Sequence, residues 1–253
     1  TAADGVANTG FIARWDGSTW NALGSGMNNT VRKLALDSAG NVYAAGAFTS
    51  AGGVAATAVA KWDGASWSAL GTSPSSSVYQ MTIDSNNKVY VGINQGYISK
   101  WNGSSWTTLP HMSCTRWNSS GADPSTVWCE WSNMQALAAG TNGDIYAWNK
   151  DSIVWYPYSR GVRCALKKWN GSGWSSIYGR SGGCNSPEVK VILIDYYARV
   201  YVGGNWLNPS TGTGSLISIE GSTTKIPDDN ISSGNVNAIG MLNQSSVYVG
   251  GNF

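Results

Sequence analysis

The amino-acid sequence predicts an all-β fold built from repeated four-stranded units. Three observations support this prediction: a composition typical of short strands and tight turns, a recurring Val/Ile-Tyr dipeptide, and a recurring Trp-Asp/Asn-Gly motif. The 253 residues include 32 Gly and 14 Trp, but only 12% are charged. Low charge combined with many aromatic residues is typical of a folded chain rich in turns and not of a disordered one.

The composition also excludes several classes of partner. The net charge is +2, and no run of Lys or Arg is longer than two residues. Nucleic-acid binding needs a basic patch, so we expect no nucleic-acid partner. A membrane span needs about 18 uninterrupted apolar residues, and the sequence has no such stretch. We therefore expect no membrane insertion.

Strands A and B of each unit are predicted from the tyrosine repeat. An apolar run precedes each Val/Ile-Tyr pair, and the two are separated by a turn. In the clearest copy, strand A is Val31–Leu36 and strand B is Val42–Gly46, joined by Asp-Ser-Ala-Gly-Asn. The repeated tyrosines are Tyr43, Tyr90, Tyr146, Tyr201 and Tyr248.

Strands C and D are predicted from the tryptophan repeat. In the same copy, strand C is Ala58–Trp62 and strand D is Trp67–Leu70. The Asp-Gly between them accepts the positive φ angles of a hairpin turn. Trp62 and Trp67 then face each other across the hairpin, where an aromatic pair stabilises by roughly 0.2–1 kcal/mol. In the last copy Ile219 and Thr224 replace both tryptophans together, which favours a structural role for the pair.

Four antiparallel strands repeated around a ring form a β-propeller. The sequence opens on strands C and D and ends on strands A and B, so we expect the two halves to complete one blade. Strand B at Val247–Gly251 should then pair with strand C at Phe11–Trp15. The prediction is a five-bladed ring of four-stranded antiparallel blades in a single domain, 1–253. Its blades are 236–253 plus 1–24, 31–71, 78–110, 134–179 and 189–227, with an insert at 111–133.

The repeat resembles the WDG-containing propeller repeats of secreted and cell-surface proteins, which are similar to kelch and galactose-oxidase-type blades. The motifs that carry this resemblance are RWDGSTW, KWDGASW, KWNGSSW and KWNGSGW, starting at Arg14, Lys61, Lys100 and Lys168. In size and in its aromatic, Gly-rich blades the chain is also similar to five-bladed lectins of the tachylectin-2 type. Both resemblances imply the fold, and neither implies a particular chemistry.

The irregular connections all fall at one end of the blades. We call the end with the B–C and D–A connections the loop end, and the end with the A–B and C–D turns the turn end. The loop end has the insert 111–133, the segment 149–163, and long connections near residues 180 and 206. Long loops on one side of a rigid scaffold are where binding is most often found.

All four cysteines lie at this loop end. We predict the disulfides Cys114–Cys129 and Cys164–Cys184, although four cysteines allow three pairings that sequence alone does not separate. The spacing does not suit zinc, so we expect no metal. Disulfides indicate an oxidising compartment, and we expect an extracellular or cell-surface location with a signal peptide already removed.

Aromatic and polar residues at the loop end are the predicted ligand contacts. Aromatic rings stack on the C–H faces of sugars, and amide or charged groups bond their hydroxyls. An alternative for the aromatics is a small core within the long inserts. The residues are Trp117, Trp128, Trp131, Trp148, Trp155, Tyr156, Tyr158, Trp206, Arg116, Asp123, Glu130, Asp151, Arg160 and Asn208.

The sequence does not favour catalysis. General acid–base chemistry needs a histidine or two carboxylates in one site, and His111 is the single histidine. Asp123 with Glu130, or Asp151 with Glu188, are conceivable loop pairs. The second position of strand A should line the centre of the ring, and it is polar without being acidic: Arg32, Tyr79, Gln135, Lys190 and Asn237. We expect no enzyme and no cofactor.

The sequence therefore predicts a secreted or surface-displayed carbohydrate-binding propeller, lectin-like and without catalysis. Its partner would be a glycan or glycoprotein. The alternative is a structural or adhesive module that binds other extracellular protein chains. A glycan-active enzyme is the least favoured class.

Overall fold

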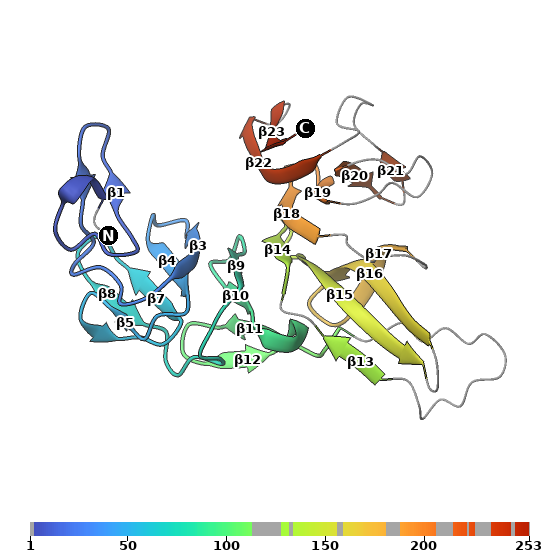
Figure 1. Ribbon diagram of the computed structural model, residues 1–253, viewed down its shortest axis with the longest axis horizontal. Helices are drawn as coiled ribbons and strands as arrows, with labels where there is room; N and C mark the ends of the chain where they lie inside the picture. The colour runs from blue at the N-terminus through green and yellow to red at the C-terminus, as the bar shows by residue number, and fades with distance from the viewer. Residues whose placement is uncertain are drawn as a thin grey trace. The chain divides into compact units, whose positions relative to one another are not determined.

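The computed structural model describes residues 3–112, 128–131, 134–155, 159–180, 188–205, 215–221, 223–225, 234–243 and 246–252. The chain divides into two compact units, Thr1–Pro110 and His111–Phe253. We call them the N-terminal and C-terminal units and describe each by itself (Figure 1).

The N-terminal unit contains two complete blades and two extra hairpins. Its strands are β1 (Arg14–Trp15), β2 (Trp20–Asn21), β3 (Val31–Leu36), β4 (Val42–Gly46), β5 (Ser50–Ala51), β6 (Val54–Ala55), β7 (Val59–Trp62), β8 (Trp67–Ala69), β9 (Gln80–Ile83), β10 (Val89–Gly92), β11 (Ile98–Trp101) and β12 (Trp106–Thr108). The blades are the antiparallel sheets β3-β4-β7-β8 and β9-β10-β11-β12. Strands β1 and β2 form a two-stranded sheet, as do β5 and β6.

The C-terminal unit also contains two complete blades and a hairpin. Its strands are β13 (Trp128–Trp131), β14 (Ala136–Ala139), β15 (Ile145–Trp155), β16 (Ser159–Trp169), β17 (Trp174–Arg180), β18 (Glu188–Ile194), β19 (Val200–Asn205), β20 (Leu216–Glu220), β21 (Thr223–Lys225), β22 (Asn235–Asn243) and β23 (Ser246–Asn252). One blade is β14-β15-β16-β17, with β13 added on β15, and the other is β18-β19-β20-β21. Strands β22 and β23 pair with each other.

The fold is an all-β propeller, as predicted, but it has four complete blades, and the prediction of five is wrong. Among the described residues, β23 pairs only with β22 and β1 only with β2. Strand β1 is two residues long and pairs only through Arg14 and Trp15. Phe11, at the start of the predicted strand, has a φ of 61°, which is not an extended conformation. A strand this short offers few of the hydrogen bonds that a four-stranded blade needs.

Neighbouring sheets in the N-terminal unit are joined by the tryptophans of strand D. The indole N–H of Trp67 donates to the Leu23 carbonyl at 2.8 Å, and that of Trp106 donates to the Leu70 carbonyl at 2.6 Å. A glycine follows each leucine, and a Cβ at Gly71 would lie 3.1 Å from the Trp101 ring. The Leu-Gly pair that ends one repeat thus packs against the tryptophans of the next repeat.

The first strands of successive blades pack on one another within each unit. Strand β3 contacts β9, β14 contacts β18, and β18 contacts β22. Buried aliphatic residues such as Val78, Val89 and Val189 fill the space between the sheets. Burial of such side chains is the main stabilising term between blades. Within the described residues, no helix is long and apolar enough to cross a membrane.

Candidate functional site

A β-bulge recurs at the start of strand A. In β3 the register shifts between Val31 and Lys33, and the residue left over is Arg32. The same shift leaves over Lys190 in β18 and Asn237 in β22. A bulge twists its strand and changes the direction of a side chain, and bulges are frequent beside binding sites. The polar second residue of strand A is therefore placed by a repeated backbone feature.

A glycine in strand B makes the bulge possible. The carbonyl oxygen of Thr30 lies so close to Gly46 that a Cβ there would be 2.0 Å away. At Gly251 a Cβ would be 1.9 Å from the carbonyl oxygen of Asn235. A side chain at either position would force the two strands apart, so the Gly of the Val-Tyr-x-x-Gly motif is required by this close approach.

The bulge in β3 gives Arg32 a fixed position. Its Nη1 donates to Ser77 Oγ at 2.6 Å and to the Val78 carbonyl at 3.1 Å. Its guanidinium carbon lies 4.8 Å from the centroid of the Tyr79 ring. Arg32 remains exposed to solvent. Two hydrogen bonds and one stacked ring thus hold an exposed cation at the loop end of the N-terminal unit.

An analogous contact joins the bulges of the C-terminal unit. Lys190 Nζ donates to Asn237 Oδ1 at 2.9 Å, although the two residues are 47 positions apart. Gln135 holds the corresponding position just before β14 and is partly buried. In each unit a bulge residue therefore lies beside the start of the next strand A: Arg32 beside Tyr79, and Lys190 beside Asn237. The sequence analysis placed these residues on inner strands but did not identify them as a site. The feature that could have pointed to a site was a polar residue at the second position of each apolar strand A.

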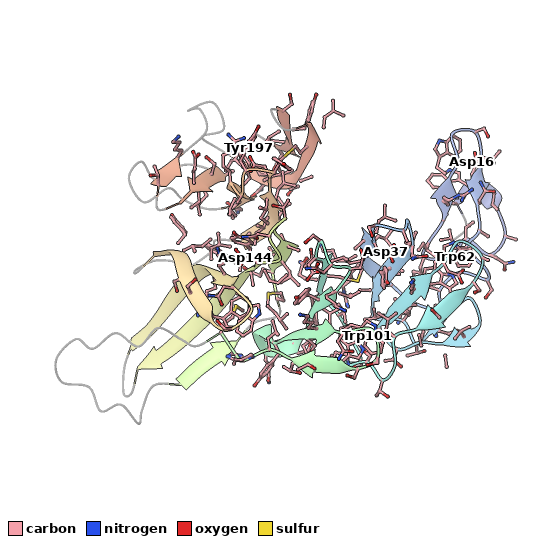
Figure 2. The ribbon with its side chains drawn as sticks, turned by 180° about the vertical axis from the view of Figure 1, so that it is seen from behind. Asp16, Asp37, Trp62, Trp101, Asp144 and Tyr197 are labelled. Carbon is pink, nitrogen blue, oxygen red and sulfur yellow. The ribbon has the colours of Figure 1, made fainter. Side chains whose placement is uncertain are left out.

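The turn end of each blade carries a different repeated cluster, which is structural. Asp37 accepts hydrogen bonds from the backbone N–H groups of Ala39 and Asn41 at 3.0 and 2.9 Å, and Tyr43 donates to it at 3.3 Å. Lys61 Nζ lies 3.8 Å from the same carboxylate. Equivalent contacts are Tyr90 to Asp84 at 3.2 Å and Lys168 to Asp144 at 2.6 Å (Figure 2).

The titration behaviour of this cluster follows from its contacts. Burial raises the pKa of the Tyr90 hydroxyl, and the Asp84 charge raises it further. Burial would also raise the pKa of Asp37, but hydrogen bonds from Asn41 and Ala39 and the Lys61 charge bring it below its usual value. The Asp37 carboxylate is thus held ionised by its own turn, and the cluster serves the A–B turn.

Most of the ligand contacts predicted from sequence fall where no side chain is described. Trp117, Tyr156, Tyr158, Trp206, Arg116, Asp123 and Asn208 lie outside the described residues. The backbone alone is described for Trp128, Trp131, Trp155, Glu130, Asp151 and Arg160. For these residues the prediction of ligand contact stays a prediction.

Trp148 is the exception, and its predicted role in ligand contact is wrong. Its side chain is 1% exposed and lies in the core with Leu166 and Val189. Its ring stacks on Tyr178, with centroids 6.5 Å apart. Trp148 pairs with Ala136 on one side and with Leu166 on the other, in the middle of the sheet. The indole therefore faces other strands and not solvent.

The segment 149–163, predicted as a loop, is largely an extended hairpin. Strands β15 and β16 are 11 residues each. They stay in register along their whole length, from Ile145 opposite Trp169 to Trp155 opposite Ser159. Strand β13, inside the predicted insert, pairs with β15. This register places Trp131, Asp151 and Arg163 in one row across three strands. Glu130 is opposite Ser152, and Trp128 is opposite Val154.

The cysteine pairings lie partly outside the described residues. Cys114 and Cys184 are not described, and the predicted disulfides stay predictions. Cys129 is opposite Ile153, and Cys164 is opposite Lys150, on strands that flank β15. Two strand spacings, roughly 9–10 Å, separate them across the sheet, and three residues of β15 add about 10 Å along it, whereas a disulfide needs Cα atoms within about 7 Å. The register therefore disfavours a bond between Cys129 and Cys164.

The described residues offer little for catalysis or metal binding. Among them, no group of three or more His, Cys, Asp or Glu residues could hold a metal ion. Several described acidic side chains serve turns or ion pairs, such as Asp195 with Arg199. The arrangement that the structure does provide is one of hydrogen-bond donors and acceptors at the loop end.

Comparisons with known proteins do not bear on the chemistry of the site. No protein-family model and no curated protein matches the chain, so the resemblance to WDG, kelch or tachylectin-2-type repeats has no support from them. One of the solved structures that match the chain is described as "YCF48 bound to D1 peptide". It is 8% identical, with a TM-score of 0.36, and the match covers 89% of this chain and 76% of that one. The chain is a β-propeller, compatible with a binding or interaction module.

Proposed function

We propose that this chain is a non-catalytic binding module that takes a carbohydrate at the loop end of its blades. The observation that carries the proposal is the repeated bulge, which brings polar residues of consecutive blades side by side. Arg32 lies next to Ser77 and Tyr79 in one unit, and Lys190 next to Asn237 in the other. Sugars need several hydrogen-bonding groups close together, with an aromatic surface nearby.

The sequence predicts aromatic residues at the same end. The backbone register sets Trp131, Asp151 and Arg163 in one row on adjacent strands. The rigid four-stranded sheets beneath them supply the fixed scaffold that a binding site requires.

A glycan array probed with the intact chain tests the proposal. We expect binding to a subset of glycans that is lost in Trp155→Ala or Tyr156→Ala while circular dichroism stays unchanged. The matched control is Tyr196→Ala at the turn end, where the ring is 65% exposed and forms an edge contact with Tyr197. Binding that is lost equally in Tyr196→Ala, or no binding to any glycan, would contradict the proposal.

A second candidate function, a protein-binding or adhesive module, has one observation in its favour. The solvent side of β3 carries Leu34 and Leu36, which are 56% and 66% exposed. Exposed apolar side chains in a row are frequent at protein interfaces. Under this alternative, a complex with another chain would bury these leucines, and Leu34→Ser with Leu36→Ser would abolish the complex.

A further inference from the structure

We propose that the bulge at Arg32 is an anion subsite that takes the carboxylate of an acidic sugar. This proposal rests on the proposed carbohydrate-binding function and specifies its substrate class. It rests on which of the five N–H groups of Arg32 bond to the protein and which remain for a ligand.

Among the described residues, Arg32 uses one of its terminal nitrogens for hydrogen bonds to the protein. Both bonds come from Nη1, to Ser77 Oγ at 2.6 Å and to the Val78 carbonyl at 3.1 Å. A guanidinium has five N–H groups, and Nη1 carries two of them. Of the other three, the Nε–H and one Nη2–H point in the same direction along one edge of the group, and the second Nη2–H points toward the Nη1 side. That edge matches the two oxygens of a carboxylate, which binds arginine side-on through two parallel hydrogen bonds.

The guanidinium is held in place before any ligand arrives. Tyr79 stacks beneath it at 4.8 Å, and Ser77 and Val78 fix one end of its plane. An arginine side chain loses considerable rotamer freedom when a ligand fixes it, and a side chain already fixed loses less. A pre-oriented, exposed guanidinium therefore binds an oxyanion more tightly than a free surface arginine does.

Most carboxylates of the N-terminal unit lie away from Arg32. Residues 1–110 contain five acidic residues. One is Asp4, an exposed residue near the start of the chain, and the other four are Asp16, Asp37, Asp63 and Asp84. All four cap turns at the turn end through hydrogen bonds to the backbone N–H groups of those turns. Strand β3 runs from Arg32 at the loop end to Asp37 at the turn end, so its length separates the two groups. The ion pairs of the described residues do not include Arg32.

Carbohydrates carry oxyanions as uronate carboxylates or as sulfate esters, and a uronate carboxylate is the better fit to the side-on edge of a guanidinium. Leu34 is exposed two residues further along β3, and it offers apolar surface next to the cation for the C–H face of a sugar ring. Ser77 Oγ already accepts from Arg32, and its own hydroxyl hydrogen is free to donate to a sugar hydroxyl.

The test compares two probes that differ in one carboxylate, methyl β-glucuronide and methyl β-glucoside, by calorimetric titration of the intact chain. We expect the glucuronide to bind at least about tenfold more tightly, as one charge-assisted pair implies. Arg32→Gln should remove this preference, and Arg32→Lys should remove most of it because an ammonium lacks the side-on edge. The matched control is Arg14→Gln, which removes one positive charge from an exposed residue of the same unit.

A second measurement separates this subsite from the proposed function. The side-chain Nε–H signal of Arg32 is followed by NMR during titration with sodium acetate and, in parallel, sodium sulfate and sodium chloride. We expect a saturable shift with acetate, a weaker one with sulfate and none beyond ionic strength with chloride. Glycan binding without the acetate shift would overturn the subsite alone. The acetate shift without any glycan binding would retain the anion subsite and overturn its assignment to a sugar.

Discussion

Trp20 and Trp67 hold the same place in the repeat and meet different surroundings. Each faces a partner tryptophan across its hairpin with ring centroids 5.5 Å apart, Trp15 in one case and Trp62 in the other. Trp67 is 4% exposed and donates its indole N–H to Leu23, whereas Trp20 is 38% exposed and no indole hydrogen bond is described for it. The hairpin pair is thus intrinsic to the repeat, and burial depends on docking against a neighbouring sheet.

The comparison predicts the largest effect at Trp67 itself. Trp67→Ala should lower the free energy of unfolding by about 3–5 kcal/mol, because it empties a buried site and removes one of the two hydrogen bonds that the Leu23 carbonyl accepts. Trp20→Ala should cost below about 1 kcal/mol, the value of an exposed aromatic pair. Urea unfolding monitored by circular dichroism measures both. Equal losses in the two variants would show that docking does not distinguish them.

Two adjacent glycines sharpen the comparison. Gly52 and Gly53 both have positive φ, but a Cβ at Gly52 would lie 2.5 Å from Trp67 Cδ1, whereas at Gly53 the nearest neighbour is Ser25 Oγ at 3.8 Å. The cost of backbone strain is common to both changes. Gly52→Ala should therefore destabilise by about 1–3 kcal/mol more than Gly53→Ala, through overpacking. In a Trp67→Ala background this difference should disappear, and its persistence would show that another neighbour causes it.

The turn-end cluster predicts a smaller, pH-dependent effect. Asp37→Asn should cost about 1 kcal/mol at neutral pH, since it weakens charge-assisted hydrogen bonds and the contact with Lys61. The folded pKa of Asp37 is below its unfolded value, so the carboxylate stabilises fully above about pH 4 and loses this effect as the pH falls through the folded pKa. Unfolding titrations between pH 7 and 2 should show wild type and variant converging at the acidic end. A constant difference at all pH values would contradict this assignment.

The smallest effect is expected at Lys33, where a substitution should raise the stability instead of lowering it. Burial against the neighbouring sheet lowers its pKa, and the described contacts give its ammonium group no hydrogen bond. Lys33→Met keeps the apolar length and removes the half-buried charge, so stability at pH 7 should rise by up to about 1 kcal/mol. The gain should shrink as the pH rises toward the unfolded lysine pKa. A loss of stability would mean that the ammonium group has a partner.

The blade was predictable because its signals are local. The strands Val31–Leu36 and Val42–Gly46 were predicted and are observed with the same bounds. The tryptophan pairs were predictable too, since the Asp-Gly turn sets which residues face each other. Blade number is not local, because it depends on whether separate hairpins join their edges. The long register of β15 with β16 was hidden by Pro157 and by polar residues that are typical of a loop.

The candidate site was only half predictable. The polar positions at Arg32, Lys190 and Asn237 are visible in sequence, but their bulges arise from how a strand meets its neighbour. Trp148 shows the opposite kind of difference. The sequence suggested an aromatic residue available to a ligand at the loop end, and the structure has its side chain in the core. Contacts between sequence-distant residues, such as Arg32 with Ser77, are decided by the packing of whole sheets.

The central claim is that the loop end, with its bulge residues, binds a saccharide. It is tested most directly by a crystal structure of the intact chain grown with the tightest ligand from the glycan array. The account predicts a sugar at the loop end, with Arg32, Lys190 or Asn237 within hydrogen-bond distance of it. A sugar bound at the turn end, against Tyr196 and Tyr197, would contradict it.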